Sequence, residues 1–90
     1  MEIKKKLTIN SEFGLHARPA TDLVKLAQKF QSNMFLYRLD NEHKKADCKS
    51  VLSILLLGAN KGTELMLCGH GVDAHLAIEE ISNFFDENLN

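Results

Sequence analysis

The spacing of apolar residues predicts two helices that each bury one face. In the first helix, apolar residues recur three or four positions apart, and polar residues occupy the positions between them. This is the period of an amphipathic helix of about four turns, which we expect to end at Asn33. The second helix follows Asp73, a residue type that favours the N-cap. The apolar stripes are Ala20, Leu23, Val24, Ala27 and Phe30 in the first helix, and Ala74, Ala77, Ile78, Ile81, Phe84 and Phe85 in the second.

Alternation of apolar and polar residues predicts four strands. The first strand alternates regularly except for Lys5, a charged residue at an inward position. The second is rich in aromatic and aliphatic side chains, and a polar turn at residues 40–43 separates it from a weaker third strand. In the fourth strand we expect Leu65 and Leu67 to face inward. The strands are predicted at residues 3–9, 34–39, 44–49 and 63–68.

A further, short helix is predicted between the third and fourth strands, so that it lies between the other two helices in the chain. Ser50 is a favourable N-cap, Gly58 is a favourable C-terminal stop, and Val51–Leu57 lies between them. The order of elements is therefore β-α-β-β-α-β-α. Because every helix has an apolar face, we expect an α+β open-faced sandwich in which three helices cover one face of a four-stranded, antiparallel-type sheet. One such sheet accounts for residues 1–90 as a single domain.

The short helix has more apolar residues than one buried face requires. Six of the seven residues in Val51–Leu57 are apolar. They surround the helix, so some of them must face water. A few exposed leucines are ordinary in a small protein. If Leu52, Leu55 and Leu56 are exposed together, they instead form a docking surface for a partner protein.

Composition narrows the classes of function. The chain of 90 residues has a formal net charge of −1, so we expect no binding to nucleic acid through general basicity. Its longest apolar run is far shorter than the ~20 residues of a membrane-spanning helix, and we expect a cytoplasmic protein that does not act at a membrane. Cys48 and Cys68 are expected to be reduced, buried thiols. Cys68, His70 and His75 match no zinc-binding pattern, so we expect no metal and no cofactor.

The segment Gly14–Ala20, GLHARPA, places a histidine and an arginine where the first strand gives way to the first helix. His16 falls at or near the N-cap, next to the unpaired amides of Ala17 and Arg18. Pro19 suits the first turn, because its missing amide would have had no helical partner. The helix end and the guanidinium both favour a neutral, nucleophilic imidazole, and both would stabilise a phosphoryl group attached to it. This pattern alone leaves open the alternative of an ordinary exposed histidine and arginine.

The same segment, together with Lys49–Ser50, Leu57–Gly58 and Lys61–Gly62, resembles the histidine-containing phosphocarrier proteins of the HPr family. These proteins serve the bacterial phosphoenolpyruvate-dependent sugar phosphotransferase system. The resemblance covers essentially the full chain, and the family's fold is an open-faced sandwich with the same order of elements. It implies a stoichiometric phosphoryl carrier that is not itself an enzyme.

The resemblance also implies roles for particular residues. His16 would accept a phosphoryl group on Nδ1 from phosphorylated enzyme I and pass it to a sugar-specific EIIA-type or EIIB-type domain. Arg18 and the Ala17 N–H would neutralise the group in transit. Ser50 would be a regulatory site for an HPr kinase/phosphorylase, although helix capping explains its residue type equally well. The partner-docking surface of this expected monomer would comprise Phe13, Thr21, Leu52, Leu55 and Leu56.

Three features depart from the family's pattern. Phe13 stands where small or polar residues are common, and it would enlarge the docking surface. About three additional residues lie between Ala20 and Ser50, and we place them in the hairpin at residues 40–45, where insertion costs little. Ser53 stands where glycine is common in the short helix. The first and third departures bear on the choice of partner.

Two other functions fit parts of the pattern. The first is a regulatory, nitrogen-type phosphorelay without sugar transport, which the sequence does not separate from the sugar pathway. The second is a small hydrolase such as an acylphosphatase, which also uses an arginine on a compact α/β frame. No asparagine–arginine arrangement in the chain supports the hydrolase, which would turn over acyl phosphates without a partner.

Overall fold

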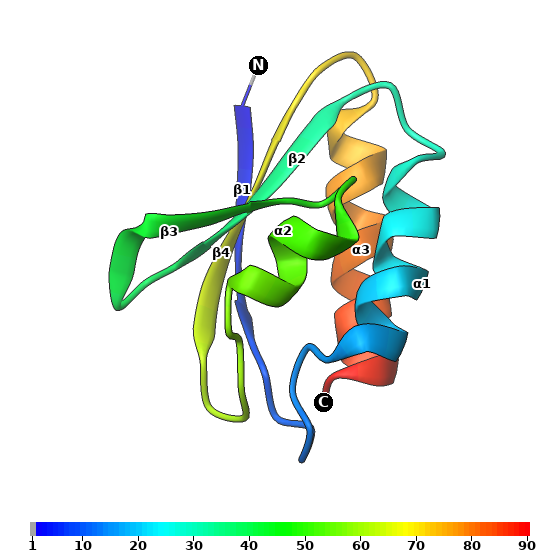
Figure 1. Ribbon diagram of the computed structural model, residues 1–90. Coiled ribbons are helices and arrows are strands. Elements are labelled where there is room, and N and C mark those ends of the chain that lie inside the picture. The colour runs from blue at the N-terminus through cyan, green and yellow to red at the C-terminus, as the bar shows by residue number, and fades with distance from the viewer. Residues whose placement is uncertain (1) are drawn as a thin grey trace.

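Seven elements follow one another in the predicted order (Figure 1). The computed structural model describes residues 2–90, and Met1, the first residue of the predicted domain, lies outside them. The strands are β1 (Glu2–Thr8), β2 (Asn33–Arg38), β3 (Asn41–Asp47) and β4 (Glu64–His70). The helices are α1 (Ala17–Ala27), α2 (Val51–Leu56) and α3 (Ala74–Asn88). The order β-α-β-β-α-β-α is confirmed.

The four strands form one sheet in the order β1-β4-β2-β3, and every neighbouring pair is antiparallel. In the middle of the sheet, β4 pairs Leu65 with Leu7 of β1 and Leu67 with Leu36 of β2. The three helices lie on one side of this sheet (Figure 1). The predicted open-faced sandwich is therefore confirmed.

The core lies between the sheet and the helices. The apolar stripes of α1 and α3 point into it, and only Phe84 is half-buried at its margin. Lys5, the charged residue at an inward strand position, is exposed. Burial of aliphatic side chains is the main term that holds the helices on the sheet. The hydrophobic strand residues with no exposed surface are Met34, Leu36, Ala46, Leu65 and Leu67.

The first helix is shorter than its apolar spacing predicts. α1 ends at Ala27 with Gln28 as its C-cap, whereas Asn33, the predicted end, is the first residue of β2. After the helix, the amides of Lys29 and Phe30 each donate to a carbonyl three residues back (3.1 Å). Such bonds tighten the chain at a helix end. Phe30 is still buried, so a core residue beyond the helix extends the apolar stripe and makes the helix look longer in the sequence.

The turn between β2 and β3 has two residues, Leu39 and Asp40, and not the predicted four at residues 40–43. Arg38 holds this turn, because its guanidinium donates to both carboxylate oxygens of Asp40 (2.9 Å each). These hydrogen bonds lower the pKa of the Asp40 carboxyl. The polar composition was misleading because the residues after Asp40 lie on an exposed edge strand, which is as polar as a turn.

The third strand also departs from its prediction. It was expected at residues 44–49, but it begins at Asn41. Tyr37 of β2 pairs with Lys45, whereas the next residue of β2 pairs with Asn41. Residues 42–44 therefore bulge out of the ladder between the two strands. This irregularity lies in the hairpin where the additional residues of the chain are predicted from the sequence.

Candidate functional site

A loop that depends on Gly14 leads from β1 to α1. Gly14 has a φ angle of +64°, which glycine adopts without strain. A Cβ atom on Gly14 would lie 2.5 Å from the carbonyl oxygen of Ala59 and 2.8 Å from Cα of Asn60. The amide of Leu15 donates to the same Ala59 carbonyl (2.9 Å). The start of α1 is therefore held against the loop that follows α2.

His16 is the N-cap residue of α1, the position that the sequence predicts. Its backbone is extended, with φ −86° and ψ −173°, and its carbonyl accepts the first helical hydrogen bond from Ala20 (2.9 Å). Its side chain is exposed and makes no capping hydrogen bond. A serine or aspartate at this position normally bonds to an amide of the first turn. The imidazole of His16 instead leaves the helix end open.

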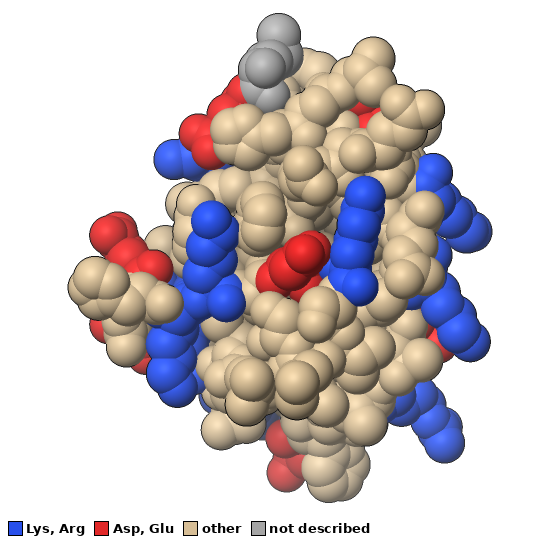
Figure 2. Space-filling model, turned by 45° about the horizontal axis from the view of Figure 1, so that its top comes forward, with Lys and Arg blue, Asp and Glu red and all other residues tan. Residues whose placement is uncertain are grey.

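The amides of Ala17 and Arg18 are available at this open end. Neither donates to an acceptor found among residues 2–90, and Pro19 has no amide. The Arg18 side chain is exposed and takes part in none of the five ion pairs found in the same residues. Figure 2 shows basic side chains along the side of the molecule that α1 occupies, with few acidic ones among them. Two donors, a positive helix end and a guanidinium together make a local environment that suits an anion.

Two other predicted site residues lie close to His16 in the sequence. The Phe13 side chain is 79% exposed. Its ring centroid lies 6.0 Å from that of His16, with 75° between the ring planes. Thr21 is exposed on α1, one turn after Ala17, and its Oγ1 donates to the carbonyl of Ala17 (2.8 Å). Phe13, His16, Ala17 and Thr21 are therefore all exposed at or close to the start of the helix.

The short helix α2 presents the predicted leucines to solvent. Leu52, Leu55 and Leu56 are 66%, 40% and 69% exposed, whereas Ile54 is fully buried. These leucines are spaced three and four residues apart, so they share one side of the helix. α2 packs against α1 and β3. A small apolar surface thus lies on the helix that neighbours α1.

Ser50 is the N-cap of α2, also as the sequence predicts. Its Oγ accepts a hydrogen bond from the amide of Ser53 (3.2 Å), and Ser50 is half-buried. Ser53 adds a second bond, in which its Oγ accepts from the amide of Asp47 (2.9 Å). This start of a helix is therefore satisfied by its own side chains.

The remaining reactive groups lie away from this site. Cys48 and Cys68 are free and buried, and burial raises the pKa of both thiols. Among residues 2–90, no group of three histidine, cysteine or carboxylate side chains comes together as a metal site. No helix within these residues has the length and apolar character needed to cross a membrane. His70 pairs with Glu2 at the far end of β1 (2.8 Å).

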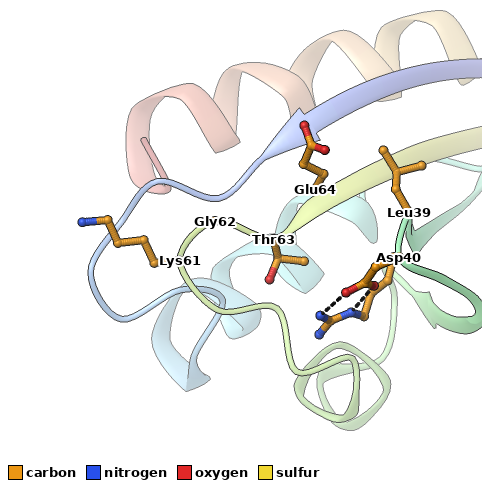
Figure 3. A pocket seen from close by; sticks show the side chains of 7 residues that line it. Leu39, Asp40, Lys61, Gly62, Thr63 and Glu64 are labelled. Carbon is orange, nitrogen blue, oxygen red and sulfur yellow. Dashed lines mark hydrogen bonds and ion pairs between the residues drawn. The ribbon is translucent and has the colours of Figure 1, made fainter.

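A hollow of about 510 Å³ opens between the β2–β3 turn and the loop before β4 (Figure 3). No predicted site residue lines it. At its wall, Arg38 also donates to the carbonyls of Leu57 (3.2 Å) and Gly58 (2.7 Å), so it secures the end of α2. The residues that line the hollow are Arg38, Leu39, Asp40, Lys61, Gly62, Thr63 and Glu64.

Two features that bear on the site were not predicted from the sequence. One is Arg38, which joins the turn after β2 to the end of α2. The other is the contact between the rings of Phe13 and His16. The spacing of these two residues around Gly14 was the available signal. A glycine turn brings residues i and i+3 together, but it does not specify which side chains meet.

The fold and the site define a class of small open-faced sandwich proteins with an exposed histidine at the start of a helix. A sequence model described as "PTS HPr component phosphorylation site" matches residues 3–87 of this chain. The chain therefore belongs to the HPr family of phosphocarrier proteins of the phosphotransferase system.

The similarity to individual relatives supports this assignment to the family. The phosphocarrier protein HPr of Xylella fastidiosa is 33% identical over 88 residues, which are 98% of this chain and 96% of that protein. A multiphosphoryl transfer protein of Haemophilus influenzae is 38% identical over 86 residues, which are 91% of this chain but 17% of that protein. The solved structure of a mycoplasma histidine-containing phosphocarrier protein is 36% identical, with a TM-score of 0.88 over 97% of each chain.

Proposed function

We propose that the protein carries a phosphoryl group on His16, which it accepts from phosphorylated enzyme I and passes to a sugar-specific EIIA-type domain. The observation that carries this proposal is the exposed imidazole at the start of α1, without a capping bond and beside two free amides and Arg18. The names of the relatives, phosphocarrier protein and multiphosphoryl transfer protein, support it.

The geometry suits a group that must be accepted and then released. A ring nitrogen of neutral His16 attacks phosphorus with its lone pair, and the bond between phosphorus and the donor breaks. The amides of Ala17 and Arg18 and the guanidinium then face the negative charge of the phosphoryl group. Because the helix end is exposed, its contribution is about 0.3–1 kcal/mol per charge. Such weak stabilisation permits onward transfer, so the protein acts as a stoichiometric carrier and not as an enzyme.

The exposed apolar residues around this site are the proposed docking surface. Phe13 contacts the His16 ring, the polar Thr21 is exposed on α1, and Leu52, Leu55 and Leu56 lie on the neighbouring helix. Apolar residues exposed together on a small protein commonly mark a surface that binds a partner. A partner that covers this surface would also exclude water from the phosphoryl group.

Ser50 is the proposed regulatory site. Its hydroxyl already lies at the start of α2, so a phosphate added by an HPr kinase/phosphorylase would be tolerated by the helix dipole. The same charge would stand beside the leucines of α2, which a partner has to desolvate. Phosphorylation of Ser50 would therefore weaken docking without unfolding the protein.

Labelling with phosphoenolpyruvate and enzyme I tests the carrier function. The wild-type protein should gain one phosphate per chain, lost in acid and kept in base, whereas His16→Ala should gain none. Ser50→Ala is the matched control and should be labelled like the wild type. Labelling of His16→Ala to the same extent as the wild type would contradict the proposal.

A further inference from the structure

We infer that Phe13 is a positioning residue, which holds the His16 imidazole in the orientation that accepts the phosphoryl group. The centroids of the two rings are 6.0 Å apart, and the ring planes are 75° apart. This is the edge-to-face arrangement that aromatic pairs favour. The inference rests on the proposed function, because it assigns Phe13 a task at the same site.

Within residues 2–90, no ion pair or hydrogen bond of the His16 ring accompanies this contact with Phe13. The ring makes no capping bond, and the histidine whose ring forms a side-chain hydrogen bond among residues 2–90 is His70. An exposed imidazole rotates about two side-chain bonds between several rotamers. Transfer requires a rotamer in which the reacting ring nitrogen is aimed at the phosphorus of the donor. The contact with Phe13 therefore restricts a ring that would otherwise be mobile.

Phe13 is exposed, but its backbone is anchored. Its side chain is 79% exposed, so it adds little to the core. The next residue, Gly14, donates its amide to the carbonyl of Ser11 (3.2 Å) and packs against Ala59 and Asn60. The loop can therefore hold the aromatic ring in place beside His16. One side of the imidazole is shielded by this ring, while the side chain of His16 remains exposed for a donor.

Orientation affects the rate because phosphoryl transfer needs a lone pair aimed at phosphorus, in line with the leaving group. Phosphoramidate is a suitable probe, since it transfers a phosphoryl group without a protein partner. The lone pair of a ring nitrogen forms the new N–P bond, and the P–N bond of phosphoramidate breaks. Phosphoramidate reacts in its N-protonated form, so ammonia leaves with the electron pair of that bond, and the imidazole keeps its proton on the other nitrogen. The rate of this reaction reports the His16 ring itself and not protein docking.

The experiment compares Phe13→Ala, Phe13→Leu and Phe13→Tyr with the wild type. In the unphosphorylated proteins, the NMR shifts of the His16 ring protons should be alike in the wild type and Phe13→Tyr, and displaced in the other two variants, which lack an aromatic ring. With phosphoramidate, Phe13→Ala and Phe13→Leu should be labelled on His16 roughly two- to tenfold more slowly. Phe13→Tyr should keep the wild-type rate, because it keeps the ring.

Val72→Ala is the matched control. Val72 is 88% exposed, and it precedes Asp73, which bonds to the residues that follow the far end of α1. Its removal should change neither the His16 shifts nor the rate. Melting curves of all variants should match that of the wild type, because the side chains of Phe13 and Val72 lie outside the core.

Either of two results would overturn the inference. The His16 shifts could be the same in the wild type and Phe13→Ala, or both proteins could react with phosphoramidate at the same rate. A fall in rate seen with enzyme I but not with phosphoramidate would assign Phe13 to docking alone. Failure of the proposed function is recognised separately, because the wild type itself would then remain unlabelled on His16 with either donor.

Discussion

The helices α1 and α2 pack against each other, yet their N-termini are built in opposite ways. At α2, Ser50 caps the helix with its hydroxyl, and Ser53 bonds back to the preceding strand. At α1, His16 occupies the same capping position and forms no such bond. The start of α2 is therefore closed by its own side chains, whereas the start of α1 remains open to an anion.

This difference between the two N-termini shows that the open start of α1 lacks the local stabilisation that a capping side chain provides. A capping serine contributes about 1 kcal/mol, and α1 forgoes this contribution. Its start is secured by contacts from a distant part of the chain, where Gly14 and Leu15 meet Ala59 and Asn60. The imidazole can then remain free, because the backbone beneath it is held by other residues.

Gly14→Ala should cause the largest loss in the free energy of unfolding, because it disrupts the contact of Gly14 with Ala59 and Asn60. The added Cβ would combine a strained φ angle with a clash against the Ala59 carbonyl, at a cost of about 2–4 kcal/mol. Urea unfolding measures this loss. Gly62→Ala is the matched control, because Gly62 also has a positive φ but nothing within 4 Å of its Cβ position. Equal losses in the two variants would show that the contact with Ala59 does not matter.

Asp73→Asn should have the next largest effect, and its effect should depend on pH. Asp73 is the N-cap of α3, but its carboxylate accepts bonds from the Ser32 hydroxyl and from the amides of Ser32 and Gln31 (2.9 Å for each amide). These bonds, that of the hydroxyl first, lower the pKa of Asp73. A lowered pKa means stability that is present above the ordinary carboxyl range and lost as the pH falls through the lowered value.

Thermal melts between neutral and acid pH measure this dependence. Asp73→Asn should melt below the wild type at neutral pH, and the gap should narrow as the solution is acidified. Ser32→Ala, which removes the largest cause of the lowered pKa, should give an intermediate profile. A gap of constant size at every pH would contradict the role of the Asp73 charge.

Ser50→Ala and His16→Ala should have the smallest effects on stability, and together they sharpen the comparison of the two helix ends. Ser50→Ala removes a cap and should cost about 1 kcal/mol. His16→Ala removes a side chain without a capping bond, so its change should stay within about 0.5 kcal/mol. Chemical denaturation of both variants measures the difference. A larger loss for His16→Ala would mean that the imidazole supports the helix after all.

Local signals predicted most of the fold and the centre of the candidate site. The apolar stripes of α1 and α3 placed these helices on a sheet, and all the predicted core residues in them are buried or half-buried. The residues Ser50 and His16 were placed at helix N-caps because capping depends on neighbours within one turn. The end of α1 and the β2–β3 turn were predicted wrongly, since a buried Phe30 and a polar edge strand imitate other local patterns.

By itself, the sequence determined the order of the elements, the faces they bury and the position of His16 before α1. These properties depend on periodicity and on residues close together in the chain. Only the tertiary structure decided that Gly14 rests on Ala59, that Asp73 bonds to Ser32 and that Phe13 contacts His16. Several polar and aromatic groups could have served as partners equally well. Packing of distant segments chooses among them, because it alone brings donor and acceptor, or ring and ring, within contact distance.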